Sequence, residues 1–130
     1  MKSYWDSSAL VIATQDADLR GRLVRERGFA RTHVLAETFS ALTGKMDIRM
    51  DSDFAVKLLE QMALSLDFSD LSNQEVLSAL KSAKKFGVRG GRVHDFLHAI
   101  AAKKAGVDSL LTSDRNDFES LVPGLSVEQV

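Results

Sequence analysis

The sequence predicts an α/β fold in which helices cover a mainly parallel sheet, and three observations lead to this prediction. Short apolar runs of strand length alternate along the chain with longer amphipathic segments of helical spacing. Acidic residues directly follow two of the strand candidates, at the end of a strand where parallel sheets gather their ligands. The 130 residues are 45% hydrophobic and 27% charged, which is a globular composition and suits one domain spanning residues 1–130.

The chain is expected to open with a short buried strand at residues 4–5. Asp6 ends this strand and leads directly into a helix that contains the apolar run 9–13. A second helix is predicted over residues 16–27, where two leucines lie four positions apart on one side. Gly28 is expected to end that helix in the left-handed conformation.

The middle of the chain carries two further helical patterns and one short strand candidate. Helices are predicted over residues 33–42, closed by Gly44, and within 51–66, and a strand is predicted over 66–68. Ser72 with Glu75 three residues later has the pattern of a capping box, in which each side chain caps the backbone of the other residue. The helix that starts there is expected to continue until Gly87.

The last third of the chain starts with the pair Gly90 and Gly91. This pair lacks the lysine and the spacing of a phosphate-binding loop, so we interpret it as a flexible start to a helix that ends at Gly106. A strand over 109–112, a polar turn over 113–117 and a last strand near 125–127 complete the predicted order.

Four carboxylates stand at positions that core packing does not explain. Asp6 and Asp114 each follow a strand candidate, and Glu37 and Asp95 lie off the apolar stripes of their helices. Carboxylates crowded at one edge of a sheet repel one another and need a counter-charge. Because the chain offers oxygen ligands and no cysteine, the expected counter-ion is a hard cation, Mg²⁺ or Mn²⁺, which also favours phosphate oxygens.

Composition excludes several classes of protein. The absence of cysteine rules out a disulfide framework, a thiolate nucleophile and cysteine-based metal sites. The net charge of -1 provides no global attraction to nucleic acid or to anionic membranes. The longest apolar run, residues 9–13, is far too short to span a bilayer, so we expect a cytoplasmic protein without membrane contact.

Four motifs follow one another along the chain: Tyr-Trp-Asp-Ser-Ser-Ala-Leu from Tyr4, the helix with Glu37, Val-His-Asp ahead of an alanine-rich helix, and Thr-Ser-Asp-Arg-Asn-Asp-Phe from Thr112. In this order they resemble the motifs of PIN-domain proteins, and most closely those of VapC-type toxin ribonucleases. The resemblance covers the chain from Tyr4 to about Phe118, and the last motif is the most specific. It implies a PIN-like three-layer α/β/α sandwich with a mainly parallel central sheet.

The resemblance also implies an activity and assigns residues to it. The activity is Mg²⁺- or Mn²⁺-dependent endonucleolytic hydrolysis of single-stranded or looped RNA. By position, the metal-binding and catalytic carboxylates are Asp6, Glu37, Asp95 and Asp114, with Asp117 as an accessory metal ligand. Ser8 and Thr112 match hydroxyl positions near the metal, although both residue types also form local backbone hydrogen bonds.

For partners, the resemblance implies a homodimer and a small cognate antitoxin that inserts a segment near the acids. Helices carrying Phe39, Leu42, Phe54 and Leu58 offer apolar contact surface for such partners, or those side chains are simply core. The alternative function is a catalytically inactive PIN-like module that binds RNA or protein.

Three other interpretations of the motifs fit less well. His94 and His98 lie four apart around Asp95, as the zinc ligands of some proteases do, but aspartate replaces the glutamate base and only His33 remains as a third ligand. We therefore expect His94 and His98 to line the rim of the acidic pocket or to pack as partly buried polar groups. An aspartyl-phosphate phosphotransferase needs a second aspartate where Ser8 stands, and a receiver domain needs a late lysine where the last motif has Asp114.

Two basic stretches are candidates for phosphate contact. We select Arg20, Arg27, Arg89 and Arg92 as RNA-binding residues. Solvated helix faces carry the same pattern, so this assignment competes evenly with a purely structural one.

Overall fold

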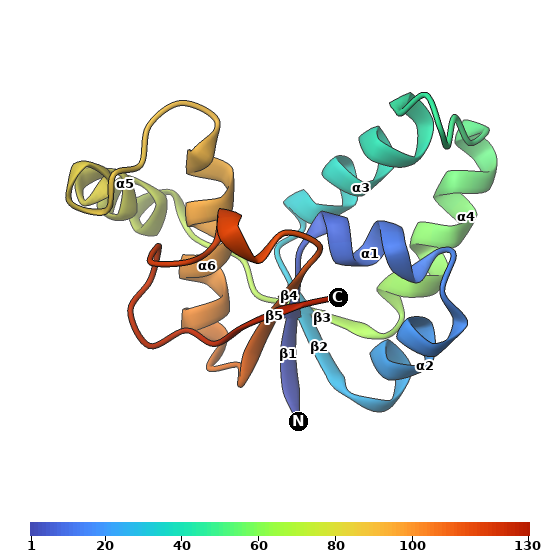
Figure 1. The fold of residues 1–130 in the computed structure, drawn as a ribbon, viewed down its shortest axis with the longest axis horizontal. Helices are drawn as coiled ribbons and strands as arrows, with labels where there is room; N and C mark the ends of the chain where they lie inside the picture. Colours follow the sequence, from blue (N-terminus) through green and yellow to red (C-terminus); the bar gives the residue numbers. More distant parts are fainter.

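A five-stranded, fully parallel sheet forms the centre of the molecule in the computed structural model, which describes all residues 1–130 (Figure 1). The strand order is β3-β2-β1-β4-β5. The strands are β1 (Lys2–Trp5), β2 (Arg27–Ala30), β3 (Leu66–Phe68), β4 (Ser109–Thr112) and β5 (Val127–Gln129). In register, Tyr4 of β1 lies between Phe29 of β2 and Leu110 of β4.

Six α-helices and two short 3-10 helices connect the strands. They are α1 (Ser7–Ala13), α2 (Ala17–Arg25), α3 (His33–Gly44), α4 (Ser52–Ala63), α5 (Asn73–Lys81), η1 (Ala83–Phe86), α6 (Arg92–Ala105) and η2 (Arg115–Asp117). None of the helices combines the length and apolar character that crossing a bilayer requires.

The helices form two layers, one on each face of the sheet. Figure 1 shows α1 to α4 on one side of the strands and α5 and α6 on the other. Successive strand residues face opposite layers, because side chains alternate along a strand. Tyr4 packs in the cluster that contains the buried face of α6, whereas Trp5 packs in the cluster formed with α1 to α4. The predicted three-layer α/β/α architecture with a parallel sheet is therefore confirmed.

Local sequence signals place several helix starts correctly. The side chain of Asp6 accepts a hydrogen bond from the N–H of Ala9 and so caps α1 directly after β1. Ser72 and Glu75 form the complete reciprocal capping box at the start of α5. Gly106 adopts the left-handed conformation, with φ of 68°, at the end of α6.

The prediction for Gly28 was wrong, because this residue lies within β2 and not at a helix end. Helix α2 already ends at Arg25, and the short strand β2 had no counterpart in the prediction. A Cβ at position 28 would lie 2.9 Å from Cδ1 of Leu23, 3.2 Å from Cδ2 of Leu66 and 3.3 Å from Nε1 of Trp5. Glycine is therefore required by close packing under the sheet and not by a left-handed turn.

Three further boundaries differ from the predictions. Helix α5 ends at Lys81, and the 3-10 helix η1 then leads to Gly87, which has a φ of 67°. The last strand is shifted from 125–127 to Val127–Gln129, because pairing with β4 sets its position. Helix α4 covers only Ser52–Ala63 of the predicted segment.

The four apolar residues proposed as contact surface divide between core and surface. Leu42 is fully buried, and Phe39 and Leu58 are partly buried. Only Phe54, which is 53% exposed on α4, is available to a partner.

Candidate active site at the carboxyl edge of the sheet

Asp6 lies at the carboxyl end of the central strand β1 and is almost buried, with 7% exposure. Its Oδ1 accepts hydrogen bonds from the Ala9 N–H at 2.8 Å and the Ser8 hydroxyl at 2.7 Å. Its Oδ2 accepts one from the Thr112 hydroxyl at 2.6 Å. Burial raises the pKa of Asp6, and these hydrogen bonds oppose the rise because they favour the ionised form. Asp6 is thus held in a fixed orientation.

Asp95 lies in the first turn of α6 and is half-buried. Burial is the main cause that raises the pKa of Asp95, and the negative charges of Asp117, Asp6 and Glu37 raise it further. The electrostatic effect of His98 opposes the rise, and the resulting pKa is about 6. Asp95 therefore lies within electrostatic range of these three acids.

Glu37 reaches this region from α3, in the opposite helical layer, and binds a buried histidine. Its Oε1 lies 2.5 Å from Nε2 of His98, and its side chain is 25% exposed. Burial on its own raises the pKa of Glu37. The hydrogen bond from His98 and the electrostatic effects of His98, His33 and His94 outweigh burial, so the pKa lies below its ordinary value. Glu37 is therefore ionised more readily than an isolated glutamate.

The two late acids differ in what their side chains do. Asp114 follows β4, is exposed, and caps η2 by accepting a hydrogen bond from the Asn116 N–H at 3.0 Å. Asp117, which we selected only as an accessory residue, is among the main charges that raise the pKa of Asp95. The backbone of Asp114 stays adjacent to the site, because its N–H donates to the Thr112 hydroxyl at 3.2 Å.

Ser8 and Thr112 connect the first and last motifs. Their hydroxyl oxygens lie 3.2 Å apart and both bind the carboxylate of Asp6. The Ser8 hydroxyl also accepts the N–H of Ser113 at 2.9 Å. Both residues therefore orient Asp6 and the chain after β4.

The three histidines of the protein meet beside the acids. His33 stacks on His94 with 5.7 Å between ring centroids, and its ring centroid is 6.4 Å from that of His98. His33 and His94 are exposed, while His98 is 2% exposed. The sequence reasoning gave no role to His33 or Tyr4. The signal available was the four-residue spacing shared by His33 with Glu37 and His94 with His98, which puts each pair on one helix face.

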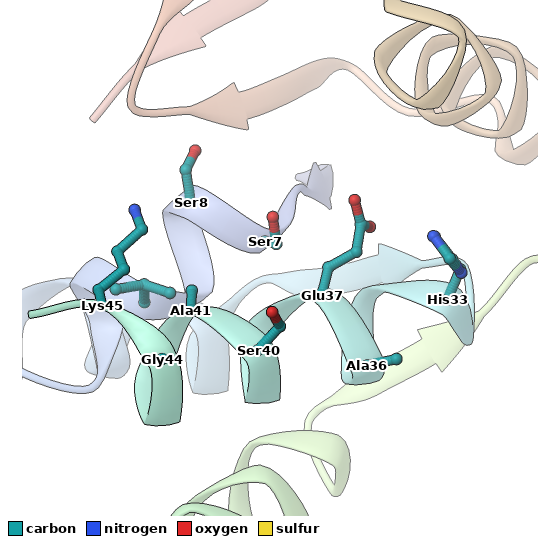
Figure 2. Close-up of a pocket in the computed structure, with 10 residues that line it drawn as sticks. Ser7, Ser8, His33, Ala36, Glu37, Ser40, Ala41, Gly44 and Lys45 are labelled. Carbon is teal, nitrogen blue, oxygen red and sulfur yellow. The ribbon is translucent and has the colours of Figure 1, made fainter. Parts of the chain in front are cut away.

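A groove of about 690 Å³ runs beside the acids between α1 and α3. Ser8 and Glu37 line it near the acids, and Ser40 and Lys45 line it along α3. In Figure 2 the side chains of Lys45, Ser8, Glu37 and His33 extend toward the same side of α3, with Lys45 and His33 at opposite ends. Lys45 is the one cationic side chain other than histidine in this lining, and the sequence reasoning did not select it.

The four selected arginines lie in different places. Arg20 donates to the carbonyl oxygens of Ala13 and Thr14 and so caps the far end of α1. Arg27 starts β2, at the edge of the sheet opposite to Asp6, and forms an ion pair with Asp67 at 2.8 Å. Arg89 and Arg92 are exposed at the start of α6, the end of that helix that carries Asp95.

The acids at this edge do not form a metal site made wholly of protein ligands. No group of three or more histidine, aspartate or glutamate side chains is arranged to hold a metal ion by direct contact. Mg²⁺ commonly takes one or two carboxylates and keeps several waters. The crowded negative charge that raises the pKa of Asp95 is the feature that such a cation would neutralise.

No protein-family model matches the chain, and no curated protein matches it. Solved structures do resemble it. The crystal structure of PAE2754 from Pyrobaculum aerophilum has a TM-score of 0.71 and 20% identity, covering 98% of this chain and 89% of that chain.

Two VapBC structures are similar in the same way. VapBC2 from Rickettsia felis, bound to a DNA fragment from their promoter, has a TM-score of 0.71 and 17% identity over 99% of this chain and 98% of that chain. VapBC-1 from nontypeable Haemophilus influenzae has a TM-score of 0.67 and 14% identity with the same coverage of both chains. The chain thus has the PIN-like fold of these structures.

Proposed function

We propose that this protein is a Mg²⁺- or Mn²⁺-dependent endoribonuclease and the toxin of a type II toxin-antitoxin pair. The observation that carries the proposal is Asp95 beyond the carboxyl edge of a parallel sheet, where burial and the charges of Asp117, Asp6 and Glu37 raise its pKa to about 6. A protein that only bound RNA would gain nothing from negative charge beside phosphate groups.

The surroundings of each acid indicate its role toward the metal ion. Asp6 and Asp95 are the expected direct ligands, because Asp6 is rigidly held and the charges of neighbouring acids raise the pKa of Asp95. Glu37 and Asp117 would hold waters of the ion. When bound, the cation supplies Lewis-acid stabilisation of the phosphate and a water of lowered pKa. The chain itself orients the carboxylates and keeps Glu37 ionised through His98.

The substrate proposed is single-stranded RNA lying in the groove between α1 and α3. The Lys45 ammonium matches a phosphate, and the hydroxyls of Ser7 and Ser40 match phosphate or 2′-hydroxyl oxygens. Lys45→Ala should weaken RNA binding and reduce its salt dependence, whereas Arg27→Ala, at the opposite edge of the sheet, should change neither.

The proposed partner is a small antitoxin protein, as the name VapBC of the two structural neighbours suggests. Both comparisons cover 99% of this chain and 98% of the other chain. A homodimer is also proposed, as the resemblance to VapC-type toxins implies. Phe54 and Val56, which are 53% and 43% exposed on α4, offer apolar surface for such contacts.

The decisive experiment is RNA cleavage by the purified protein in Mg²⁺, Mn²⁺ or EDTA. The wild type should cleave in either metal and lose activity in EDTA. Asp95→Asn should abolish cleavage, and Asp47→Asn, at an exposed position without side-chain contacts, should retain it. RNA binding without cleavage in any metal would favour the inactive binding module instead.

A further inference from the structure

A chain of hydrogen bonds runs from the sheet through the interior to Glu37. The backbone N–H of Arg31 donates to the Tyr4 hydroxyl at 3.2 Å, and that hydroxyl lies 2.6 Å from Nδ1 of His98. Nε2 of His98 lies 2.5 Å from Oε1 of Glu37. These hydrogen bonds thus connect β1, α6 and α3, which belong to the three different layers of the fold.

Core packing alone does not require the hydroxyl of Tyr4 or the imidazole of His98. Tyr4 is fully buried and His98 is 2% exposed, and a buried hydroxyl or imidazole destabilises the fold unless it is hydrogen-bonded. Phenylalanine at position 4 and an aliphatic residue at position 98 would remove that requirement. The polar pair therefore points to a task beyond filling the interior.

The chemistry of the three groups determines which atom donates in each of these hydrogen bonds. A tyrosine phenol carries its proton at neutral pH. Its oxygen accepts the N–H of Arg31, and the only acceptor for its own proton is Nδ1 of His98. The ring proton of His98 then lies on Nε2, which donates to Glu37.

We propose that Tyr4 and His98 are positioning residues that fix the orientation of the Glu37 carboxylate toward the metal site. The donated hydrogen bond occupies Oε1, and Oε2 accepts no hydrogen bond from the protein and is free to face the ion or its waters. Figure 2 shows the Glu37 side chain extending from the same side of α3 as His33. This inference rests on the proposed metal-dependent function, and it adds residues outside the carboxylate set.

The expected change in metal affinity follows from the effect of comparable hydrogen bonds to metal ligands in other proteins. Groups that orient a metal ligand through a hydrogen bond typically change metal affinity by about 10–100-fold when they are removed. Tyr4→Phe removes one oxygen from a fully buried side chain and leaves the ring in place. Ser3→Ala is the matched control, because buried Ser3 accepts a hydrogen bond from Trp5 Nε1 at 2.9 Å on the same strand and makes no contact with the acids.

The test measures Mn²⁺ affinity by calorimetry or electron paramagnetic resonance, without RNA. Tyr4→Phe should bind Mn²⁺ about 10–100-fold more weakly than the wild type. Ser3→Ala should lose folding stability but keep the wild-type affinity. In ¹⁵N spectra, His98 of the wild type should show the proton on Nε2, and Tyr4→Phe should lose this single tautomer.

A second pair of variants covers the case in which Tyr4→Phe does not fold. His98→Gln retains an N–H donor toward Glu37 and should bind Mn²⁺ more tightly than His98→Leu, which has none. Wild-type affinity in Tyr4→Phe and His98→Leu, together with weak binding by Glu37→Gln, would overturn the positioning role alone. Failure of the wild type itself to bind Mn²⁺ would overturn the proposed function and this inference with it.

Discussion

Asp95 carries the clearest conflict between folding and function in this protein. Its carboxylate is half-buried among three other acids, so ionisation opposes folding while it prepares the site for a cation. Neighbouring Asp6 avoids the same conflict in part, because three hydrogen bonds stabilise its charge.

Asp95→Asn should therefore stabilise the metal-free protein at pH 7. The pKa of Asp95 is raised from 3.8 to about 6, so folding binds a proton between these values and the free energy of unfolding falls as the pH rises through them. Two pKa units correspond to at most about 3 kcal/mol, and screening at a partly exposed site reduces this to about 1–2 kcal/mol. Urea unfolding from pH 3.5 to 7 measures the effect.

The variant and the wild type should be equally stable near pH 3.5 and should diverge toward pH 7. Asp47→Asn is the control and should follow the wild type at every pH. A constant difference between Asp95→Asn and the wild type across the whole range would contradict the proposed origin in ionisation.

Among the elements, strand β2 depends on a glycine for contact between the sheet and the α1 to α4 layer. Gly28→Ala should destabilise the protein by about 1–3 kcal/mol, since its Cβ would lie 2.9 Å from Cδ1 of Leu23 and 3.2 Å from Cδ2 of Leu66. Gly44→Ala is the matched control, because nothing lies within 4 Å of its Cβ. The midpoint of urea unfolding measures both, and equal midpoints for the two variants would refute the packing argument.

Helix α5 depends on its capping box, because only Ala79 of its residues is buried. Ser72→Ala removes the acceptor for the Glu75 N–H, which lies 3.1 Å from the Ser72 hydroxyl oxygen. The expected loss is about 1 kcal/mol, seen as faster amide hydrogen exchange in residues 73–81. Ser78→Ala, an exposed position inside the same helix, should leave exchange unchanged.

At the scale of the whole molecule, the site joins the two helical layers over the end of the sheet. Glu37 comes from one layer, and Asp95 and His98 come from the other. A cation that binds between these layers should stabilise the folded state as a whole.

Mg²⁺ or Mn²⁺ should raise the melting temperature of the protein, because the ion binds the folded state. At a metal concentration 100 times the dissociation constant, the expected stabilisation is about 2.7 kcal/mol. Asp95→Asn should lose most of the shift and Asp47→Asn should keep it, with NaCl of equal ionic strength as the salt control. An equal shift in both variants would indicate that the metal binds elsewhere.

Signals between residues close in the chain were enough to predict much of the fold. Asp6 at the start of α1, the Ser72 and Glu75 capping box and the helical spacing of α6 each involve residues within a few positions. Such local preferences act on the backbone before any distant contact forms. The parallel sheet followed from the alternation of these elements, and the resemblance of four motifs named the acids.

Contacts between distant residues could not be read in this way. Gly28 has the same pattern as a helix end, and only the packing of Trp5, Leu23 and Leu66 around it reveals a strand. Tyr4 and His98 are 94 positions apart, and His98 and Glu37 are 61 apart. Their hydrogen bonds arise only when the sheet brings both helical layers to one edge, because burial and mutual distance depend on the complete fold and not on neighbouring residues.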